Sequence, residues 1–144
     1  MVLKLQQIMT QNVIRIHPKE RIAVAARLLT QYNIGALPVC TADGKLRGVV
    51  TDRDLVVRCM AAGKVPQETL VEDVMTTGIT VGAPDMETSA AAALMGRMQV
   101  RRLPVVEDGV LRGMVSLSDL AVRQETEPDA AEALTEISTN ISYR

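Results

Sequence analysis

The chain has 144 residues with 47% hydrophobic content, which suits one globular domain or a fused pair of half-domains and excludes disordered and collagen-like classes. Its 16 Lys and Arg residues nearly balance 17 Asp and Glu residues, and no basic run marks a nucleic-acid arm. The sequence has no Trp, no Phe and only 2 Tyr, so it lacks the aromatic platforms on which single-stranded bases stack. We therefore expect no nucleic-acid partner.

The beginning of the chain has no apolar run of signal-peptide length, and the longest low-charge stretch, residues 88–96, is too short to span a bilayer. We expect a cytoplasmic protein without a membrane partner. Cys40 and Cys59 lack C-x-x-C spacing and lie in segments predicted as strand and helix. We expect both to be buried free thiols, and we expect no metal site formed with His17.

Residues 1–63 are predicted to form one structural unit. Its expected elements, in order, are a strand (12–16), a helix (20–32), a hairpin of two strands (36–40 and 45–50) and a second helix (52–62). Asp43-Gly44 is typical of a two-residue hairpin turn, and Gly63 stands where a helix end favours a left-handed residue. Residues 64–73, which include Pro66, are predicted to be a linker.

Residues 74–126 are predicted to repeat this order. The expected elements are a strand (79–81), a helix (85–99), a hairpin turning at Asp108-Gly109 and a helix from residue 117. Residues 127–144 form a tail. In it, residues 129–137 have the apolar spacing of a short amphipathic helix, which we expect to dock onto the body of the protein or onto a partner subunit.

The two units also repeat each other residue by residue, about 66 positions apart. Once Thr41 is dropped from the first copy, the matching segments are Met9-Thr10 with Met75-Thr76, Leu37-Pro38-Val39 with Leu103-Pro104-Val105, Leu46-Arg47-Gly48 with Leu111-Arg112-Gly113, and Asp54-Leu55 with Asp119-Leu120. A unit of roughly 50 to 60 residues is too short to bury a full core alone. We therefore expect the copies to pack together, with the functional site in the cleft between them.

The element order, the Leu-Pro-Val hairpin strand and the motif Gly-hydrophobic-hydrophobic-Thr/Ser-x-x-Asp make each copy resemble a cystathionine β-synthase-type (CBS) domain. Two in tandem, over roughly residues 3–124, resemble a Bateman module. The resemblance implies an α+β fold of two strand-helix-strand-strand-helix repeats packed as a pseudo-twofold pair. It also implies clefts that bind adenine nucleotides such as AMP, ADP or ATP, and in some members S-adenosylmethionine or NADH-like ligands, with no required cofactor.

The same resemblance implies roles for the motif residues. The hydroxyl residue, Thr51 or Ser116, would contact phosphate, and the aspartate, Asp54 or Asp119, would take the ribose hydroxyls. This assignment is physically sound because a helix N-terminus offers unpaired N–H groups to phosphate and a carboxylate accepts two hydroxyl hydrogen bonds. The spacing is also that of a capping box, which stabilises helices without any ligand. Both interpretations stay open, since cap and nucleotide can share these groups.

In the family the clefts are assembled crosswise, which gives two candidate sites. Site one comprises Thr51, Arg53, Asp54, Thr76, Gly78, Ile79, Val100, Arg101 and Arg102. Site two comprises Thr10, Asn12, Val13, Ile34, Gly35, Ser116, Ser118 and Asp119. Guanidinium groups bind phosphate bidentately, so Arg101-Arg102 favours site one for phosphate, although this pair can equally be a solvated charge pair at a strand entry.

Catalytic motifs are missing from the sequence, which contains no G-x-S-x-G, H-E-x-x-H or Walker-type loop. We therefore expect no catalytic residues, and a nucleotide sensor that signals to a separate regulated protein. The alternatives are a ligand-free dimeric interaction or scaffold protein and a sensor of an S-adenosylmethionine- or NADH-type ligand. CBS pairs commonly form homodimers through helical faces, and the alanine-rich segment 89–94 would permit close helix approach, so we expect a homodimer.

Overall fold

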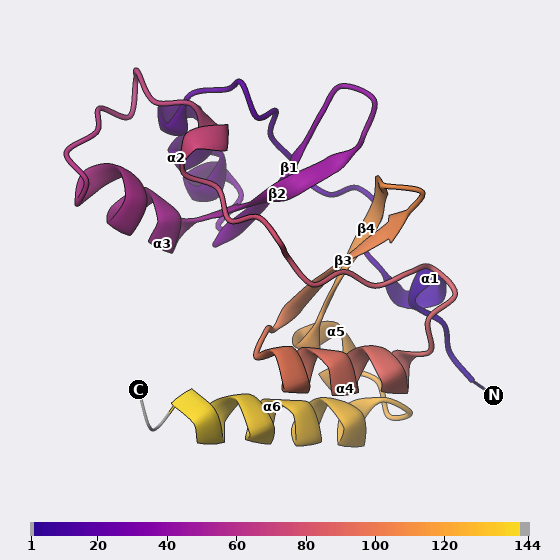
Figure 1. Cartoon of the computed structure of the whole chain (residues 1–144). Helices are drawn as coiled ribbons and strands as arrows, with labels where there is room; N and C mark the ends of the chain where they lie inside the picture. The colour runs from indigo at the N-terminus through magenta and orange to yellow at the C-terminus, as the bar shows by residue number, and fades with distance from the viewer. Residues whose placement is uncertain (1, 142–144) are drawn as a thin grey trace. The chain divides into compact units, whose positions relative to one another are not determined.

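The computed structural model of the chain describes residues 2–141 and consists of two compact units (Figure 1). The repeat-one unit contains Val13–Ile79 together with Gly109–Leu111. The repeat-two unit contains the chain up to Asn12, Thr80–Asp108 and the chain from Arg112 onward. The units therefore do not coincide with the sequence copies, because the first segment of each copy belongs to the unit that is built mainly from the other copy.

The repeat-one unit is a helix and a hairpin followed by short helical turns. Its elements are α2 (Ile22–Gln31), β1 (Ala36–Cys40), β2 (Leu46–Thr51), α3 (Asp52–Asp54), the π-helical turn η1 (Leu55–Met60) and the 3₁₀ turn η2 (Val71–Asp73). β1 and β2 pair antiparallel. The buried core of this unit consists of Ile16, Ile22, Ala25, Leu29, Leu37, Val39, Val50, Cys59, Val71 and Val74.

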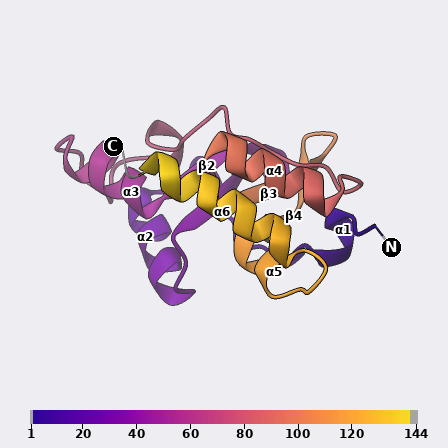
Figure 2. The same ribbon diagram turned by 90° about the horizontal axis from the view of Figure 1, so that it is seen from below.

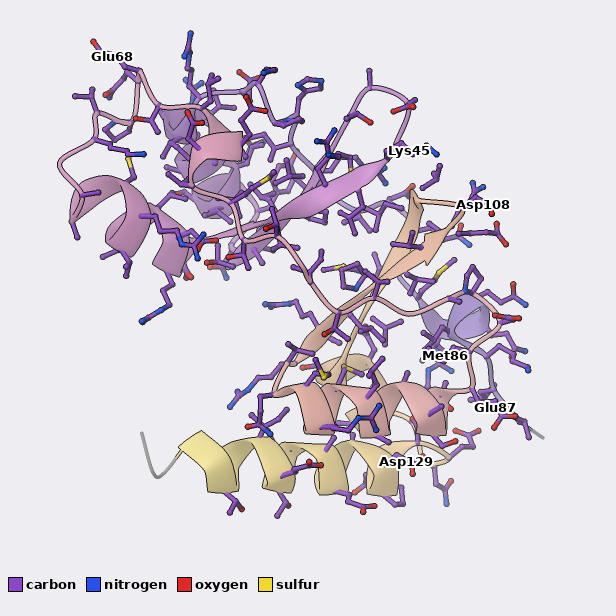
Figure 3. The ribbon with its side chains drawn as sticks, viewed as in Figure 1. Lys45, Glu68, Met86, Glu87, Asp108 and Asp129 are labelled. Carbon is purple, nitrogen blue, oxygen red and sulfur yellow. The ribbon has the colours of Figure 1, made fainter. Side chains whose placement is uncertain are left out.

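The repeat-two unit has a second two-stranded hairpin and more helix. Its elements are α1 (Leu5–Ile8), α4 (Thr88–Met98), β3 (Arg102–Glu107), β4 (Val110–Ser116, whose first two residues group with the repeat-one unit), α5 (Leu117–Ala121) and α6 (Glu127–Ile141). The Leu5 N–H donates to the Met86 carbonyl (2.9 Å), which fixes α1 beside the segment that precedes α4; Figure 3 labels Met86 and Glu87 there. The core consists of Leu5, Ala91, Ala92, Met95, Leu103, Val105, Val115, Leu117, Leu120, Ala130, Ala133 and Ile137.

The expected first strand of each copy is reduced to a single bridge. In copy one, the Ile16 N–H donates to the Pro38 carbonyl (3.0 Å) and the Ile16 carbonyl accepts from the Cys40 N–H (2.9 Å). Extending this parallel ladder in either direction would need an N–H from Pro18 or Pro38, and proline has none. Copy two has the same limitation. Its single bridge joins Gly82 and Val105, and extending it would need an N–H from Pro84 or Pro104.

The two hairpin turns differ, and the difference explains the extra residue Thr41. In copy two, Asp108 (φ 53°) and Gly109 (φ 79°) form the expected two-residue turn with both central residues left-handed. In copy one, the Thr41 N–H donates to the Lys45 carbonyl (3.0 Å), and Gly44 (φ 85°) is left-handed while Asp43 is not. The prediction of a two-residue turn at Asp43-Gly44 is therefore wrong: the loop has three central residues.

The C-terminal helix α6 lies along α4 and α5 of its own unit (Figure 2). It is longer than the expected span of residues 129–137, because Pro128 falls in its first turn, where no intrahelical N–H bond is lost. A Cβ built on Gly96 of α4 would lie 3.2 Å from the Ala133 Cα of α6. The small residues of α4 therefore allow α6 of the same chain to pack closely against it. Among the helices described, none is long and apolar enough to cross a membrane.

The glycine of each motif lies against the backbone of the other copy of the sequence. A Cβ on Gly48 would lie 2.5 Å from the Thr76 carbonyl oxygen, and a Cβ on Gly113 would lie 2.7 Å from the Thr10 carbonyl oxygen. In both places the first segment of one copy pairs with the second hairpin strand of the other, through the bridges Val49–Thr76 and Thr10–Met114. The motif requires glycine because any side chain would separate this backbone pair.

The Gly48→Ala variant is expected to lower the free energy of unfolding by about 1–3 kcal/mol, the usual cost of forcing an extra methyl group into a packed site. Gly35→Ala is the matched control, since its Cβ would meet nothing closer than an Asp52 carboxylate oxygen at 3.5 Å. That substitution should change stability by no more than about 0.5 kcal/mol. Urea denaturation of both variants checks this, and equal midpoints would contradict the role of Gly48.

Candidate functional site

Asp54 is the third residue of α3, which follows directly after β2, and it forms a reciprocal capping box with Thr51, the last residue of β2. The Thr51 N–H donates to Asp54 Oδ2 (3.0 Å), and the Asp54 N–H donates to Thr51 Oγ1 (3.0 Å). The Thr76 hydroxyl donates to the same carboxylate, at 3.1 Å from Oδ1 and 3.2 Å from Oδ2. Only 6% of the Asp54 surface is exposed, so this carboxylate is enclosed by groups of its own chain.

The bridge between Val49 and Thr76 sets this geometry. The Val49 N–H donates to the Thr76 carbonyl (3.0 Å), and the Thr76 N–H donates to the Val49 carbonyl (2.8 Å). Val49 lies two residues before Thr51, so the bridge carries the Thr76 side chain to the helix start. Residues far apart in the sequence thereby form one cluster within the repeat-one unit.

Arg58 is a member of this cluster that the sequence analysis missed. Its Nε lies 3.7 Å from Asp54 Oδ1, and its Nη1 donates to the Met75 carbonyl (3.1 Å). The available signal was the spacing, because an acidic residue four positions before an arginine on a helix favours an ion pair. Arg58 thus connects the helix that carries Asp54 with the segment that carries Thr76.

Asp119 occupies the equivalent position at the start of α5 but has fewer partners. The Ser116 N–H donates to Asp119 Oδ2 (2.8 Å), and the Asp119 N–H donates to Ser116 Oγ (3.2 Å). Thr10 is held by its backbone bridge to Met114 (2.9 and 3.0 Å), yet its side chain is exposed. Within residues 2–141 the Thr10 hydroxyl makes no hydrogen bond and Asp119 Oδ1 has no donor. The half-buried Asp119 therefore keeps a free acceptor.

The predicted site residues divide between the two units. Of site one, the repeat-one unit contains Thr51, Arg53, Asp54, Thr76, Gly78 and Ile79, and the repeat-two unit contains Val100, Arg101 and Arg102. Of site two, the repeat-two unit contains Thr10, Asn12, Ser116, Ser118 and Asp119, and the repeat-one unit contains Val13, Ile34 and Gly35. Each predicted pair of an aspartate and a crosswise threonine therefore lies inside one unit.

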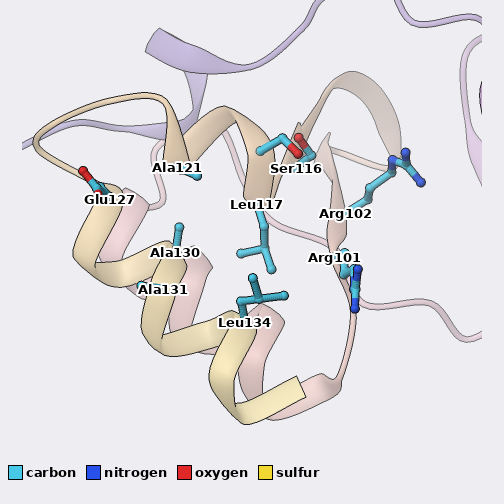
Figure 4. A pocket seen from close by; sticks show the side chains of 10 residues that line it. Arg101, Arg102, Ser116, Leu117, Ala121, Glu127, Ala130, Ala131 and Leu134 are labelled. Atoms are coloured by element: carbon cyan, nitrogen blue, oxygen red, sulfur yellow. The ribbon is translucent and has the colours of Figure 1, made fainter. Parts of the chain in front are cut away.

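A pocket of about 620 Å³ in the repeat-two unit brings the two predicted arginines close to the hydroxyl residues of the second motif. Figure 4 shows it between α5, the start of β3 and α6, with Leu117 and Leu134 pointing toward each other. Its lining consists of Arg101, Arg102, Ser116, Leu117, Ser118, Ala121, Glu127, Ala130, Ala131 and Leu134. The sequence analysis placed the arginines and these serines in different sites, and it did not foresee the contribution of α6.

The cysteines lie in the core of the repeat-one unit, with 3% of Cys40 and 1% of Cys59 exposed. Burial raises the pKa of the Cys40 thiol, and the charge of Arg15 opposes this shift. His17 is exposed, and its Nδ1 accepts a hydrogen bond from the Lys19 N–H (3.1 Å). Across residues 2–141 the structure gathers no three His, Cys, Asp or Glu side chains that could hold a metal ion.

Two α+β repeats, each ending in a hairpin and a capped helix with a motif aspartate, define a tandem regulatory domain pair. The family model of the CBS domain matches residues 5–60 and again residues 71–125. This chain therefore belongs to the CBS domain family, and it is a CBS pair.

Two curated relatives are similar over most of their length. The CBS domain-containing protein YhcV of Bacillus subtilis is 44% identical over 130 residues, which cover 90% of this chain and 91% of that protein. Hypoxic response protein 1 of Mycobacterium tuberculosis is 32% identical over 116 residues, 81% of each chain. The crystal structure of Hypoxic Response Protein I, with two coordinated zinc ions, matches with a TM-score of 0.76 and 31% identity, covering 83% of this chain and 97% of that one.

A further solved structure contains adenosyl ligands. The CBS domain pair of protein MJ0100 was crystallised in complex with 5′-methylthioadenosine and S-adenosyl-L-methionine. It matches this chain with a TM-score of 0.72 and 26% identity, over 84% of this chain and 94% of that one. Ligands of this class are therefore bound by a protein with this fold.

Proposed function

We propose that this CBS pair senses adenine nucleotides, or a related adenosyl compound, at its two motif aspartates and transmits their presence to a separate protein without catalysing a reaction. The observation that carries the proposal is Asp119 Oδ1, which has no donor among residues 2–141 although the carboxylate lies in the first turn of α5. A ribose presents two adjacent hydroxyl groups, and a carboxylate with an unused oxygen accepts hydrogen bonds from them. The ligand is a regulatory one, and no cofactor is required.

The phosphate end of such a ligand finds suitable chemistry in the same unit. Arg101 and Arg102 line the pocket that also contains the Ser116 and Ser118 side chains. Guanidinium groups bind phosphate oxygens in bidentate fashion, and serine hydroxyls add neutral donors. This chemistry favours AMP, ADP or ATP, whereas the ligands bound by MJ0100 favour an adenosyl compound without phosphate.

Calorimetric titration of the nucleotide-stripped protein with AMP, ADP, ATP, S-adenosylmethionine and 5′-methylthioadenosine distinguishes these ligands. We expect saturable binding of at least one of them, with dissociation constants in the micromolar range. Recovery of the ligand unchanged after incubation is the expected sign of a sensor rather than an enzyme. Flat titrations with all five would contradict the proposal and favour the ligand-free scaffold.

We also propose that two copies associate through the helical face of the repeat-one unit. Val56, Val57 and Met60 of η1 are 54%, 46% and 72% exposed. In the repeat-two unit the corresponding helix, α5, is covered by α6 of the same chain. An apolar helical face without such a cover is suited to a second copy. Sedimentation of the sample used for calorimetry measures how many chains associate: we expect two, and a monomer would contradict this proposal.

A further inference from the structure

We infer that Thr76 closes the Asp54 site, so that the first ligand binds at Asp119 and the unmodified protein takes one ligand per chain at moderate concentrations. The inference rests on the proposed function, because it assigns the ligand to one of the two motif aspartates. It reverses the order suggested by the sequence, in which Arg101-Arg102 favoured the site of Asp54.

Both carboxylate oxygens of Asp54 already lie beside donors of the protein. Oδ2 accepts from the Thr51 N–H (3.0 Å), and both oxygens lie within 3.1 to 3.2 Å of the Thr76 hydroxyl. A ribose hydroxyl that binds to this carboxylate competes with the Thr76 hydroxyl, which already donates to it. A hydrogen bond to a charged acceptor changes an equilibrium constant by on the order of tenfold, so displacement weakens binding by a similar factor.

Arg58 holds this closed arrangement together. It contacts the Asp54 carboxylate on one side (3.7 Å) and donates to the Met75 carbonyl on the other (3.1 Å), so it holds the backbone that precedes Thr76 close to the carboxylate. We call the Asp54, Arg58 and Thr76 cluster the latch. Its burial, with 6% of Asp54 exposed, also hinders entry of a ligand.

The repeat supplies an internal comparison, because the same positions in the other unit form no latch. Thr10 corresponds to Thr76, but its side chain is exposed and does not reach Asp119 through any hydrogen bond within residues 2–141. Arg123 corresponds to Arg58, and across the same residues its exposed side chain forms neither an ion pair nor a hydrogen bond. A ligand hydroxyl can therefore bind Asp119 without displacing a group of the protein.

The decisive variant is Thr76→Val, which keeps the shape of the side chain and removes the hydroxyl. In calorimetry with the ligand that binds the unmodified protein, we expect one equivalent per chain to become two, with affinity at the second site raised about tenfold. The matched control Thr10→Val should create no second site. Asp119→Asn should abolish the single binding event, and Asp119→Asn combined with Thr76→Val should restore one equivalent at Asp54.

The outcomes separate this inference from the proposed function. Two equivalents of equal affinity in the unmodified protein, or loss of the single event through Asp54→Asn rather than Asp119→Asn, would overturn the inference and leave the sensor function standing.

A double-mutant cycle tests the latch without any ligand. The melting-temperature losses of Thr76→Val and Asp54→Asn should be non-additive by about 2–4 °C, whereas those of Thr10→Val and Asp119→Asn should add. Additivity in both pairs would refute the latch even if no ligand binds.

Discussion

Replacing Ile137 with alanine is expected to lower the free energy of unfolding by about 2–5 kcal/mol, the range for removing a large aliphatic side chain from a packed core. Ile137 is 2% exposed and belongs to the core of the repeat-two unit, although it lies near the end of the chain. The loss combines the burial free energy of the deleted methyl groups with the cost of the cavity that they leave between α6 and its neighbours. Urea denaturation followed by circular dichroism measures it.

Leu134 provides the control on the same helix. It is 43% exposed, so Leu134→Ala removes less buried surface and should lower stability by less than about 1 kcal/mol. A small effect of Ile137→Ala would mean that the packing of α6 contributes little to the stability of the repeat-two unit. The expected large effect would make α6 an integral part of the repeat-two core, and would explain why α4 carries Gly96 and alanines where α6 approaches.

The Asp54→Ala variant is expected to lower the free energy of unfolding by about 2–4 kcal/mol. The change removes the side-chain half of the capping box and leaves two donors without their partner, the Thr51 N–H and the Thr76 hydroxyl. Burial increases the loss, because water replaces the missing acceptor only poorly at a residue that is 6% exposed. The measurement is again the free energy of unfolding from urea titration.

Asp119→Ala is the matched comparison and should lower stability by only about 1 kcal/mol. It leaves the Ser116 N–H without its carboxylate partner, but no hydroxyl or guanidinium partner is left behind among the described residues. The two aspartates occupy identical motif positions, so the difference between their losses reports the latch together with the deeper burial of Asp54. Equal losses would show that Thr76 and Arg58 add nothing to Asp54.

Local patterns predicted most of the elements correctly, because they depend on short-range physics. The strand Ala36–Cys40 has the predicted bounds, and α2 (Ile22–Gln31) lies inside the predicted helix. Gly63 has the left-handed backbone (φ 73°) expected at a helix end. Predictions failed where the effect of a residue depends on its partner strand. Pro38 lies in a strand as predicted, yet its missing N–H prevents extension of the ladder with the segment of Ile16, so the predicted strand 12–16 does not form.

The sequence by itself determined the duplication, the CBS family and the capped aspartates, because repeated motifs and cap spacing are written in consecutive residues. Only the tertiary structure decided that Thr76 reaches Asp54 whereas Thr10 leaves Asp119 open, and that α6 covers α4. Both depend on contacts between segments far apart in the chain. Their register and side-chain directions are set by backbone bridges and core packing, so two copies of one motif acquire different surroundings.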